Sequence, residues 1–171
     1  MTVFVALLRA VNVGGAGKLL MDDLKALCED AGFSGVRTYI ASGNVVFRSD
    51  SAEAEARAAL QERLHRHMGA PVGVMIRTAT DLAAMVAANP FPDAPGNTVA
   101  ALLLNEAPPP GALAAIRGQA DEEVALGLRE IYVRYGAAGM GRSKLVIPAA
   151  KLATARNMNT LSKLAQLAAA P

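Results

Sequence analysis

Apolar residues follow two different spacings along the first half of the chain. The stretch from Thr2 to Val11 is almost entirely apolar, which is typical of a strand in the middle of a sheet. From Leu20 to Ala31, apolar residues recur every three or four positions, which predicts an amphipathic helix. In order, the pattern predicts a strand at 2–11, a helix at 20–31, a hairpin with arms 36–41 and 45–49 around Ser42-Gly43-Asn44, a helix at 56–68 and a strand at 73–78.

The second half repeats this order of elements without repeating the sequence. The pattern predicts a linking helix at 81–88, a strand at 98–104, a helix at 110–120, a hairpin with arms 123–126 and 129–135, a helix at 144–152, a strand at 153–156 and a closing helix at 159–169. Strand, helix, strand, strand, helix, strand is the split βαβ order. We therefore expect an α+β protein with two ferredoxin-like βαββαβ lobes in tandem, residues 1–79 and 80–171, with a linking helix and a C-terminal helix.

Composition narrows the class of protein. A hydrophobic content of 53% with 19% charged residues is typical of a globular chain. The longest uncharged apolar run, Val3 to Leu8, is too short to cross a bilayer, and no basic segment with a cleavage site follows Met1. The single cysteine, Cys28, cannot form an internal disulfide, which favours a reducing compartment. We expect a cytoplasmic protein with no membrane partner, of unknown oligomeric state.

Charge is distributed unevenly along the chain, although the formal net charge is only +2. No carboxylate side chain follows Glu130, whereas six cations do: Arg134, Arg142, Lys144, Lys151, Arg156 and Lys163. Such a segment attracts anions when its cations share a face. Alternatively, the cations form an ordinary solvated surface.

The first candidate site is the glycine-rich stretch "VNVGGAGKLLMDDL", from Val11 to Leu24. A Walker A loop is excluded because Asn12 and Leu19 occupy its glycine and Ser/Thr positions, and a dinucleotide fingerprint because Leu20 occupies its third glycine. Glycines before a helix can still aim N–H groups at an anion, although a flexible connection is the alternative. The predicted topology places this loop beside the hairpin turn, so the candidate ligand-binding residues are Asn12, Gly14, Gly15, Lys18, Ser42 and Asn44.

The second candidate site lies in the second lobe. There, the predicted helix at 144–152 and the closing helix should begin at one edge of the sheet. Helix N-termini and cations together bind anions, although ordinary N-caps and solvated bases are the alternative. The candidate residues are Arg142, Ser143, Lys144, Arg156, Asn157, Asn159 and Thr160.

Other candidates for chemistry are weak. His65 and His67 are two residues apart on a helix, so they face different directions and do not form a metal pair. Cys28 lies in an amphipathic helix without an evident activating base, which favours a buried thiol over a nucleophile. We assign no catalytic residue, and the sequence leaves any cofactor unknown.

Five ordered blocks carry a family resemblance. They are "ALLRAVNVGG" near the start, "RTYIASGNVVF" from Arg37, "NPF" at Asn89, "GRSKL" at Gly141 and "TARNMNTLSKL" at Thr154. Together they resemble, over essentially the whole chain, the bacterial family catalogued as domain of unknown function 1697. The resemblance implies a fold and important positions but no reaction. Two positions depart from the family, which commonly has glycine at Ala10 and tryptophan, a stacking surface, at Met158.

The recurring blocks offer amides, hydroxyls, glycines and cations, which favours binding over metal-assisted hydrolysis. We expect an anionic ligand, either a phosphate-bearing small molecule or a nucleic-acid backbone. An aromatic content of 4% without tryptophan argues against stacking on single strands. Two alternatives remain: a transferase or hydrolase that uses Lys18, Lys144 or Arg156 to stabilise charge, and a protein-interaction module. A cleft shared by both candidate sites is a further hypothesis.

Overall fold

The computed structural model describes residues 1–14 and 17–170. These residues form four α-helices and two four-stranded antiparallel sheets, which confirms the α+β class. By its internal contacts the chain divides into a first unit, Met1–Ala83 with Lys163–Pro171, and a second unit, Ala84–Ser162. Residues 80–83 and 163–171 thus group with the first unit, although the sequence assigned them to the second lobe. Each unit is described separately below.

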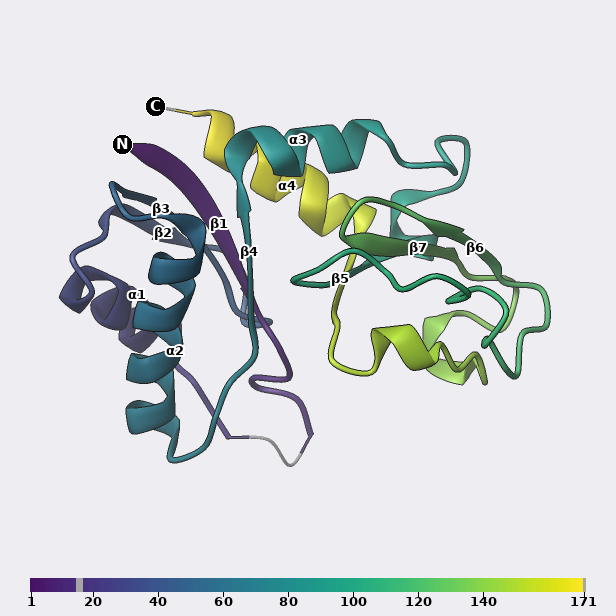
Figure 1. Ribbon diagram of the computed structural model, residues 1–171, viewed down its shortest axis with the longest axis horizontal. Coiled ribbons are helices and arrows are strands. Elements are labelled where there is room, and N and C mark those ends of the chain that lie inside the picture. The colour runs from purple at the N-terminus through teal and green to yellow at the C-terminus, as the bar shows by residue number, and fades with distance from the viewer. Residues whose placement is uncertain (15–16, 171) are drawn as a thin grey trace. The chain divides into compact units, whose positions relative to one another are not determined.

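The first unit has the βαββαβ order that the sequence predicts. Its elements are β1 (Thr2–Leu8), α1 (Met21–Asp30), β2 (Ser34–Thr38), β3 (Asn44–Ser49), α2 (Glu53–Met68) and β4 (Val74–Thr78). The strands form an antiparallel sheet in the order β2-β3-β1-β4. Helices α1 and α2 cover one face of this sheet (Figure 1). The long apolar run at the N-terminus is therefore a central strand, as its composition indicates.

The core of the first unit lies between this face and the two helices. Phe4 and Phe47 are opposite each other on β1 and β3, and their ring centroids lie 5.7 Å apart. Phe33, between α1 and β2, stacks on Phe47 with 4.1 Å between ring centroids. Leu24 of α1 and Leu60 of α2 are fully buried in the same cluster. Each such side chain contributes about 1.5–3 kcal/mol to folding through burial.

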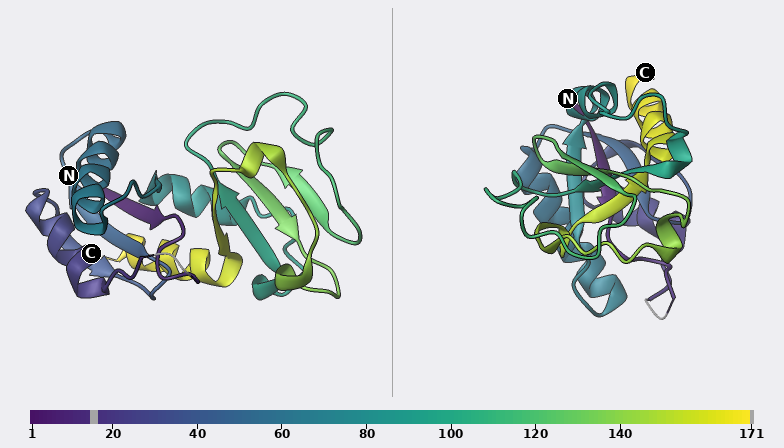
Figure 2. Two further views of the ribbon diagram at one scale, coloured as in Figure 1. Left: turned by 90° about the horizontal axis from the view of Figure 1, so that it is seen from below. Right: turned by 90° about the vertical axis from the view of Figure 1, so that its right-hand side faces the viewer.

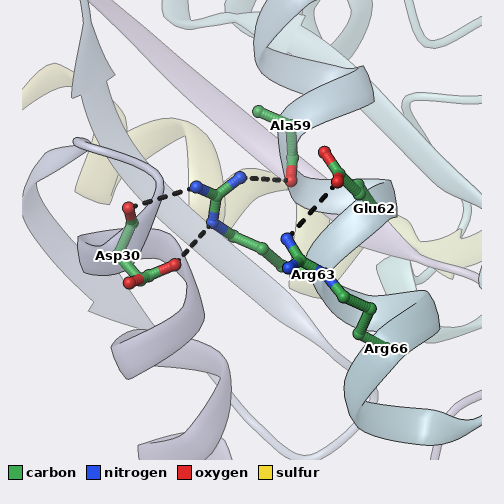
Figure 3. Close-up of polar contacts among 5 residues, drawn as sticks. All are labelled: Asp30, Ala59, Glu62, Arg63 and Arg66. Carbon is green, nitrogen blue, oxygen red and sulfur yellow. Dashed lines mark hydrogen bonds and ion pairs between the residues drawn. The ribbon is translucent and has the colours of Figure 1, made fainter.

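Arg63 joins the two helices at the edge of this core (Figure 3). Its Nε lies 2.8 Å from the carboxylate of Asp30, at the end of α1, and a terminal nitrogen donates to the Asp30 carbonyl at 3.3 Å. The other terminal nitrogen donates to the carbonyl of Ala59 in α2 at 3.1 Å. Arg66, three residues further along α2, pairs with Glu62 of its own helix at 3.4 Å. Arg63 therefore ties α1 to α2, whereas the Arg66 ion pair lies within α2.

The second unit contains a sheet with the same strand order but different connections. Its strands are β5 (Val99–Leu103), β6 (Glu123–Leu126), β7 (Glu130–Arg134) and β8 (Thr154–Asn157), in the order β6-β7-β5-β8. Short 3₁₀ turns occur at Gly96–Thr98, Met140–Arg142 and Pro148–Ala150. Figure 2 shows the long irregular segments that link these strands. Two further helices, α3 (Ala79–Ala87) and α4 (Met158–Ala169), each contribute residues to both units.

The predicted helices at 110–120 and 144–152 are wrong. Instead, Arg117 and Val146 form an isolated antiparallel bridge, with N···O distances of 2.9 and 2.8 Å. Gly118 has φ +68°, and a Cβ there would overlap the carbonyl of Lys144. Pro148 lies inside the second predicted helix, where its ring would clash with the preceding turn. Both segments therefore consist of turns around this bridge, with a 3₁₀ turn at Pro148–Ala150, and several of their apolar side chains, such as Leu113 and Leu152, are exposed.

Candidate functional site

Asn12 ties together the segments at one end of the first sheet. Its amide nitrogen donates to the carbonyl oxygens of Leu19 and Ala41, both at 2.8 Å. Its side-chain oxygen accepts from the backbone nitrogen of Leu19 at 2.7 Å. As predicted, Asn12 lies beside the turn that contains Ser42. Both of its amide protons are used within the protein, so Asn12 holds the loops in place.

The β2–β3 turn is equally fixed. Asn44 is fully buried and donates to the Tyr39 carbonyl and to the Ser42 hydroxyl, both at 2.9 Å. Gly43 has φ +90°, and a Cβ there would lie 2.7 Å from the side chain of Val11. Only glycine fits this turn, for both backbone and packing reasons. The hairpin chemistry of Ser42 and Asn44 therefore positions the turn against the end of β1.

Three residues other than glycine adopt left-handed backbone at this same end. They are Ala10 (φ 56°), Asn12 (φ 57°) and Ile40 (φ 52°). This region costs a non-glycine residue roughly 1–2 kcal/mol, and β-branched residues such as isoleucine rarely adopt it. The positive φ at Ala10 explains why glycine suits that position in the family it resembles. Strain of this kind is held by surrounding bonds, here those of Asn12.

A cavity of about 540 Å³ opens beside these loops. Its lining comprises Asn12, Gly14, Lys18, Leu19, Leu20, Met21 and Ala41. Lys18 is exposed, and within residues 1–14 and 17–170 its ammonium group has no ion pair. Gly15 lies outside the described residues. The predicted members Asn12, Gly14 and Lys18 are thus brought together around one cavity.

Apolar side chains are unusually exposed in the same loops. Val13 is 61% exposed, Leu20 54% and Ile40 48%. Leu20 lines the cavity, whereas Val13 and Ile40 directly follow or precede lining residues in the sequence. The surroundings of Lys18 are therefore largely apolar.

Helix α1 begins at this cavity without a side-chain cap. Leu20 occupies the N-cap position in extended conformation and its side chain makes no capping hydrogen bond. Asp22 and Asp23 lie in the first turn, where carboxylates stabilise the helix dipole. Asp23 pairs with His67 of α2 at 3.7 Å, so its charge is directed away from the cavity lining. Met21 is the first residue of α1 and lines the cavity. Its side chain is apolar, so its polar groups here are those of the backbone.

The second predicted site differs from its expected form. The predicted site was to contain two helix N-termini. No α-helix begins within residues 144–152, so the N-terminus expected at Lys144 is absent from this segment. The Ser143 hydroxyl donates to Glu122, and the backbone nitrogen of Ala137 donates to Asp121 at 3.0 Å. Arg142 and Lys144 are exposed. The carboxylates of Asp121 and Glu122 therefore accept hydrogen bonds from the loop at 136–143. These are donors that the sequence analysis had assigned to an anionic ligand.

Glu122 is the centre of this arrangement. Glu122 is a buried residue, and its carboxyl also accepts from the Ala120 backbone nitrogen at 2.7 Å. Hydrogen bonds from Ser143 and then from Ala120 hold the pKa of Glu122 below its usual value. Burial, and secondarily the Glu122 charge, raises the pKa of Tyr135. Sequence reasoning missed Asp121 and Glu122, because nothing local signals a contact with a loop beyond the β6–β7 hairpin.

The remaining predicted residues cluster where β8 meets α4. The side-chain oxygen of Asn157 accepts from the Thr160 backbone nitrogen at 2.9 Å, which is N-cap bonding. Asn159 is exposed, and its side-chain oxygen packs closely against Gly96. A Cβ on Gly96 would overlap this oxygen. Arg156 is partly buried and donates to the Ala155 carbonyl at 2.9 Å; burial lowers its pKa to about 10. Asn157 thus caps α4, which is the role that the sequence analysis gave as the alternative to anion binding.

The other residues considered for chemistry have ordinary settings. Cys28 is fully buried in the first core, where burial and then the Glu29 charge raise its pKa to about 12. Met158 is also buried, so its side chain offers no open stacking surface. Across residues 1–14 and 17–170, no group of three or more His, Cys, Asp or Glu residues is arranged to hold a metal. In the same part of the chain, every helix is too short or too polar to span a membrane.

Comparison with known proteins supports the fold. The family model described as "Protein of unknown function (DUF1697)" matches residues 1–132. No curated protein matches the sequence. Among solved structures, the conserved bacterial protein SP0830 from Streptococcus pneumoniae matches with a TM-score of 0.78 and 21% identity, over 98% of both chains. At that identity the likeness concerns the fold alone.

Proposed function

The chain belongs to the DUF1697 family of proteins of unknown function, and from that premise we propose that its first unit binds a phosphate-bearing small molecule. The observation that carries this proposal is the cavity of about 540 Å³ lined by Asn12, Gly14 and Lys18. Its volume is within the range of small-molecule sites. The single, buried Cys28 fits a reducing cytoplasm as the setting.

Each lining group has a role in this proposal. The Lys18 ammonium supplies the positive charge, and the backbone at Gly14 and Met21 supplies N–H donors to phosphate oxygens. Asn12 does not contact the ligand in this scheme, because its amide is engaged with Leu19 and Ala41. It acts as a positioning residue that fixes the loops before the ligand arrives. Such preorganisation lowers the entropic cost of binding.

The surroundings of Lys18 favour a small molecule over a polymer. Exposed Leu20 and buried Leu19 line the cavity, which suits a ligand with an apolar body beside its phosphate. A nucleic-acid backbone requires several cations along one track. In the second unit, Arg134 pairs with Glu123 at 3.0 Å and Arg156 is partly buried, which reduces the exposed charge of the cationic segment.

A screen of phosphorylated metabolites by thermal shift tests the proposal. A ligand that binds only the folded chain raises its melting temperature. For each hit, calorimetry should give at least about tenfold weaker binding to the Lys18→Gln variant, since a charged hydrogen bond is lost. Lys144→Gln is the matched control, because Lys144 is an exposed lysine of the second unit. It should bind each hit as the unchanged protein does.

Three results would overturn the proposal. The first is a library without a hit at low salt, and the second is a hit that Lys144→Gln weakens but Lys18→Gln does not. The third is binding of a labelled oligonucleotide with a steep linear loss of affinity against log salt, which would assign a nucleic-acid partner instead. Turnover of a hit into product would establish the transferase or hydrolase alternative at the same cavity.

A further inference from the structure

We propose that the first unit carries a second anion site, separate from the Lys18 cavity, at a pocket formed by Arg37 and Arg48. The pocket has a volume of about 380 Å³ and is bordered by β1, β2, β3, α1 and the residue after α4. Its charged lining residues are Lys25, Glu29, Arg37 and Arg48. Three cations and one carboxylate give this pocket a net positive charge.

The sheet register brings the two arginines to one face. Arg37 of β2 is opposite Val46 of β3, and Arg48 is two residues further along β3. Residues two apart on a strand face the same side, so Arg37 and Arg48 are diagonal neighbours across the two strands. Phe47, between Val46 and Arg48, faces the opposite side, toward the core. The arginines therefore lie on the sheet face that α1 and α2 do not cover.

Arg37 is anchored within this pocket. One of its terminal nitrogens donates to the carbonyl of Leu167, near the end of α4, at 2.6 Å. This bond fixes the guanidinium plane and leaves further N–H donors of the fork for a ligand. Ala170, three residues beyond Leu167, also lines the pocket. The end of α4 thus helps to shape the pocket and to orient Arg37.

Arg48 is the group that most needs a counter-ion. It is half-buried, and within the described ranges 1–14 and 17–170 its guanidinium has no hydrogen bond or ion pair. Its Nη1 lies 3.5 Å from the position of a Cβ on Gly35, which has φ +58°. Because β2 is the edge strand and Gly35 lacks a side chain, Arg48 has room to lie across it. Glu29, the carboxylate that lines the pocket, pairs with Lys25, with 4.0 Å between the ammonium nitrogen and the carboxylate oxygen.

The chemistry of the pocket indicates its ligand. Guanidinium groups present two parallel N–H donors, which match the paired oxygens of phosphate. Two arginines with a lysine nearby suit a doubly charged anion better than a singly charged one. The class of ligand is therefore a phosphate dianion, either inorganic or as a small monoester. A volume of about 380 Å³ admits a ligand of that size.

Titration with inorganic phosphate, followed by amide NMR, tests this site. Phosphate should shift the amide signals of Gly35, Val36 and Arg48 in the unchanged protein and equally in Lys18→Gln. Arg48→Gln should weaken phosphate binding at least about tenfold, because a charged donor pair is lost. Arg48→Lys keeps the charge without the fork and should give an intermediate affinity. Arg66→Gln, on the exposed side of α2, is the matched control and should bind normally.

The proposal fails if Arg48→Gln binds phosphate as tightly as the unchanged protein while its NMR spectrum remains that of a folded chain. It also fails if the shifts appear at Gly14 and Lys18 instead of Gly35, or if nitrate shifts the same amides with equal affinity. Since Lys18→Gln tests one cavity and Arg48→Gln the other, the two proposals stand or fall separately.

Discussion

Ala10 is an exposed alanine held in a backbone conformation that suits glycine, with φ 56°. Asn12 and Ile40 share that conformation, and the Asn12 side chain bonds to Leu19 and to Ala41, the residue after Ile40. The sequence predicted that Asn12 and the Ser42 turn lie together. It could not predict that the Asn12 amide donates to the carbonyl of Ala41, because hydrogen-bond partners 29 residues apart leave no local pattern.

Ala10→Gly should stabilise the protein. Relief of left-handed strain is worth roughly 1–2 kcal/mol, and the added freedom of the unfolded chain offsets about 0.5–1 kcal/mol of it. The expected net gain is about 0.5–1 kcal/mol in urea unfolding. Ala26→Gly, at an exposed position inside α1, is the opposite control and should cost about 1 kcal/mol. A loss of stability in Ala10→Gly would contradict the conformational argument.

Cys28 should resist thiol reagents in the folded protein. Burial raises its pKa from 9.0 to about 12, so at pH 8.5 the reactive thiolate is nearly absent. Above pH 9 the folded chain therefore keeps a thiol proton that the unfolded chain loses. As the pH rises from 9 toward 12, this difference lowers the free energy of unfolding. Labelling with a maleimide, followed by mass spectrometry, should be slow in buffer and fast in urea. Rapid labelling without urea would show that the thiol is accessible.

Among the elements, prediction succeeded where apolar spacing and local turn residues agree. The stripes of α1 and α2 and the hairpin around Gly43 follow from the sequence and place the first candidate site. The segments at 110–120 and 144–152 have helical spacing too, yet Arg117 pairs with Val146 and Pro148 interrupts the second segment. Long-range pairing of this kind overrides local propensity. For the same reason, the contact of Ser143 with Glu122 could not be predicted.

At the level of the helix pair, Arg63→Gln should destabilise the first unit. Arg63 bonds to Asp30 and to the Ala59 carbonyl, and it is less exposed than Arg66. We expect a loss of about 1–3 kcal/mol in urea unfolding, because charged hydrogen bonds between two helices are removed. Arg66→Gln breaks an exposed pair within α2 and should cost less than about 0.5 kcal/mol. Equal effects of the two variants would show that Arg63 does not tie α1 to α2.

For the molecule as a whole, the first unit depends on residues from both ends of the chain. Leu164 and Ala168 are buried, and the Leu167 carbonyl accepts from Arg37. Deletion of residues 163–171 should therefore speed amide exchange in β1, β2 and β3, as mass spectrometry would record. Leu164→Ala, expected to cost about 2–5 kcal/mol, gives the same test without truncation. Gln166→Ala, at an exposed position of α4, is its control; unchanged exchange in the first two variants would contradict the dependence.

The discontinuity of the first unit also matters while the chain is being synthesised. Its residues up to Ala83 leave the ribosome first, and the whole second unit is translated before Lys163 follows. At about 5–20 residues per second, the two parts of the first unit are separated by roughly 4–16 seconds of translation. During that interval Arg37 lacks the carbonyl that orients it, and part of the sheet lacks its late-arriving helix residues. The first unit therefore reaches its complete set of contacts only after α4 has emerged.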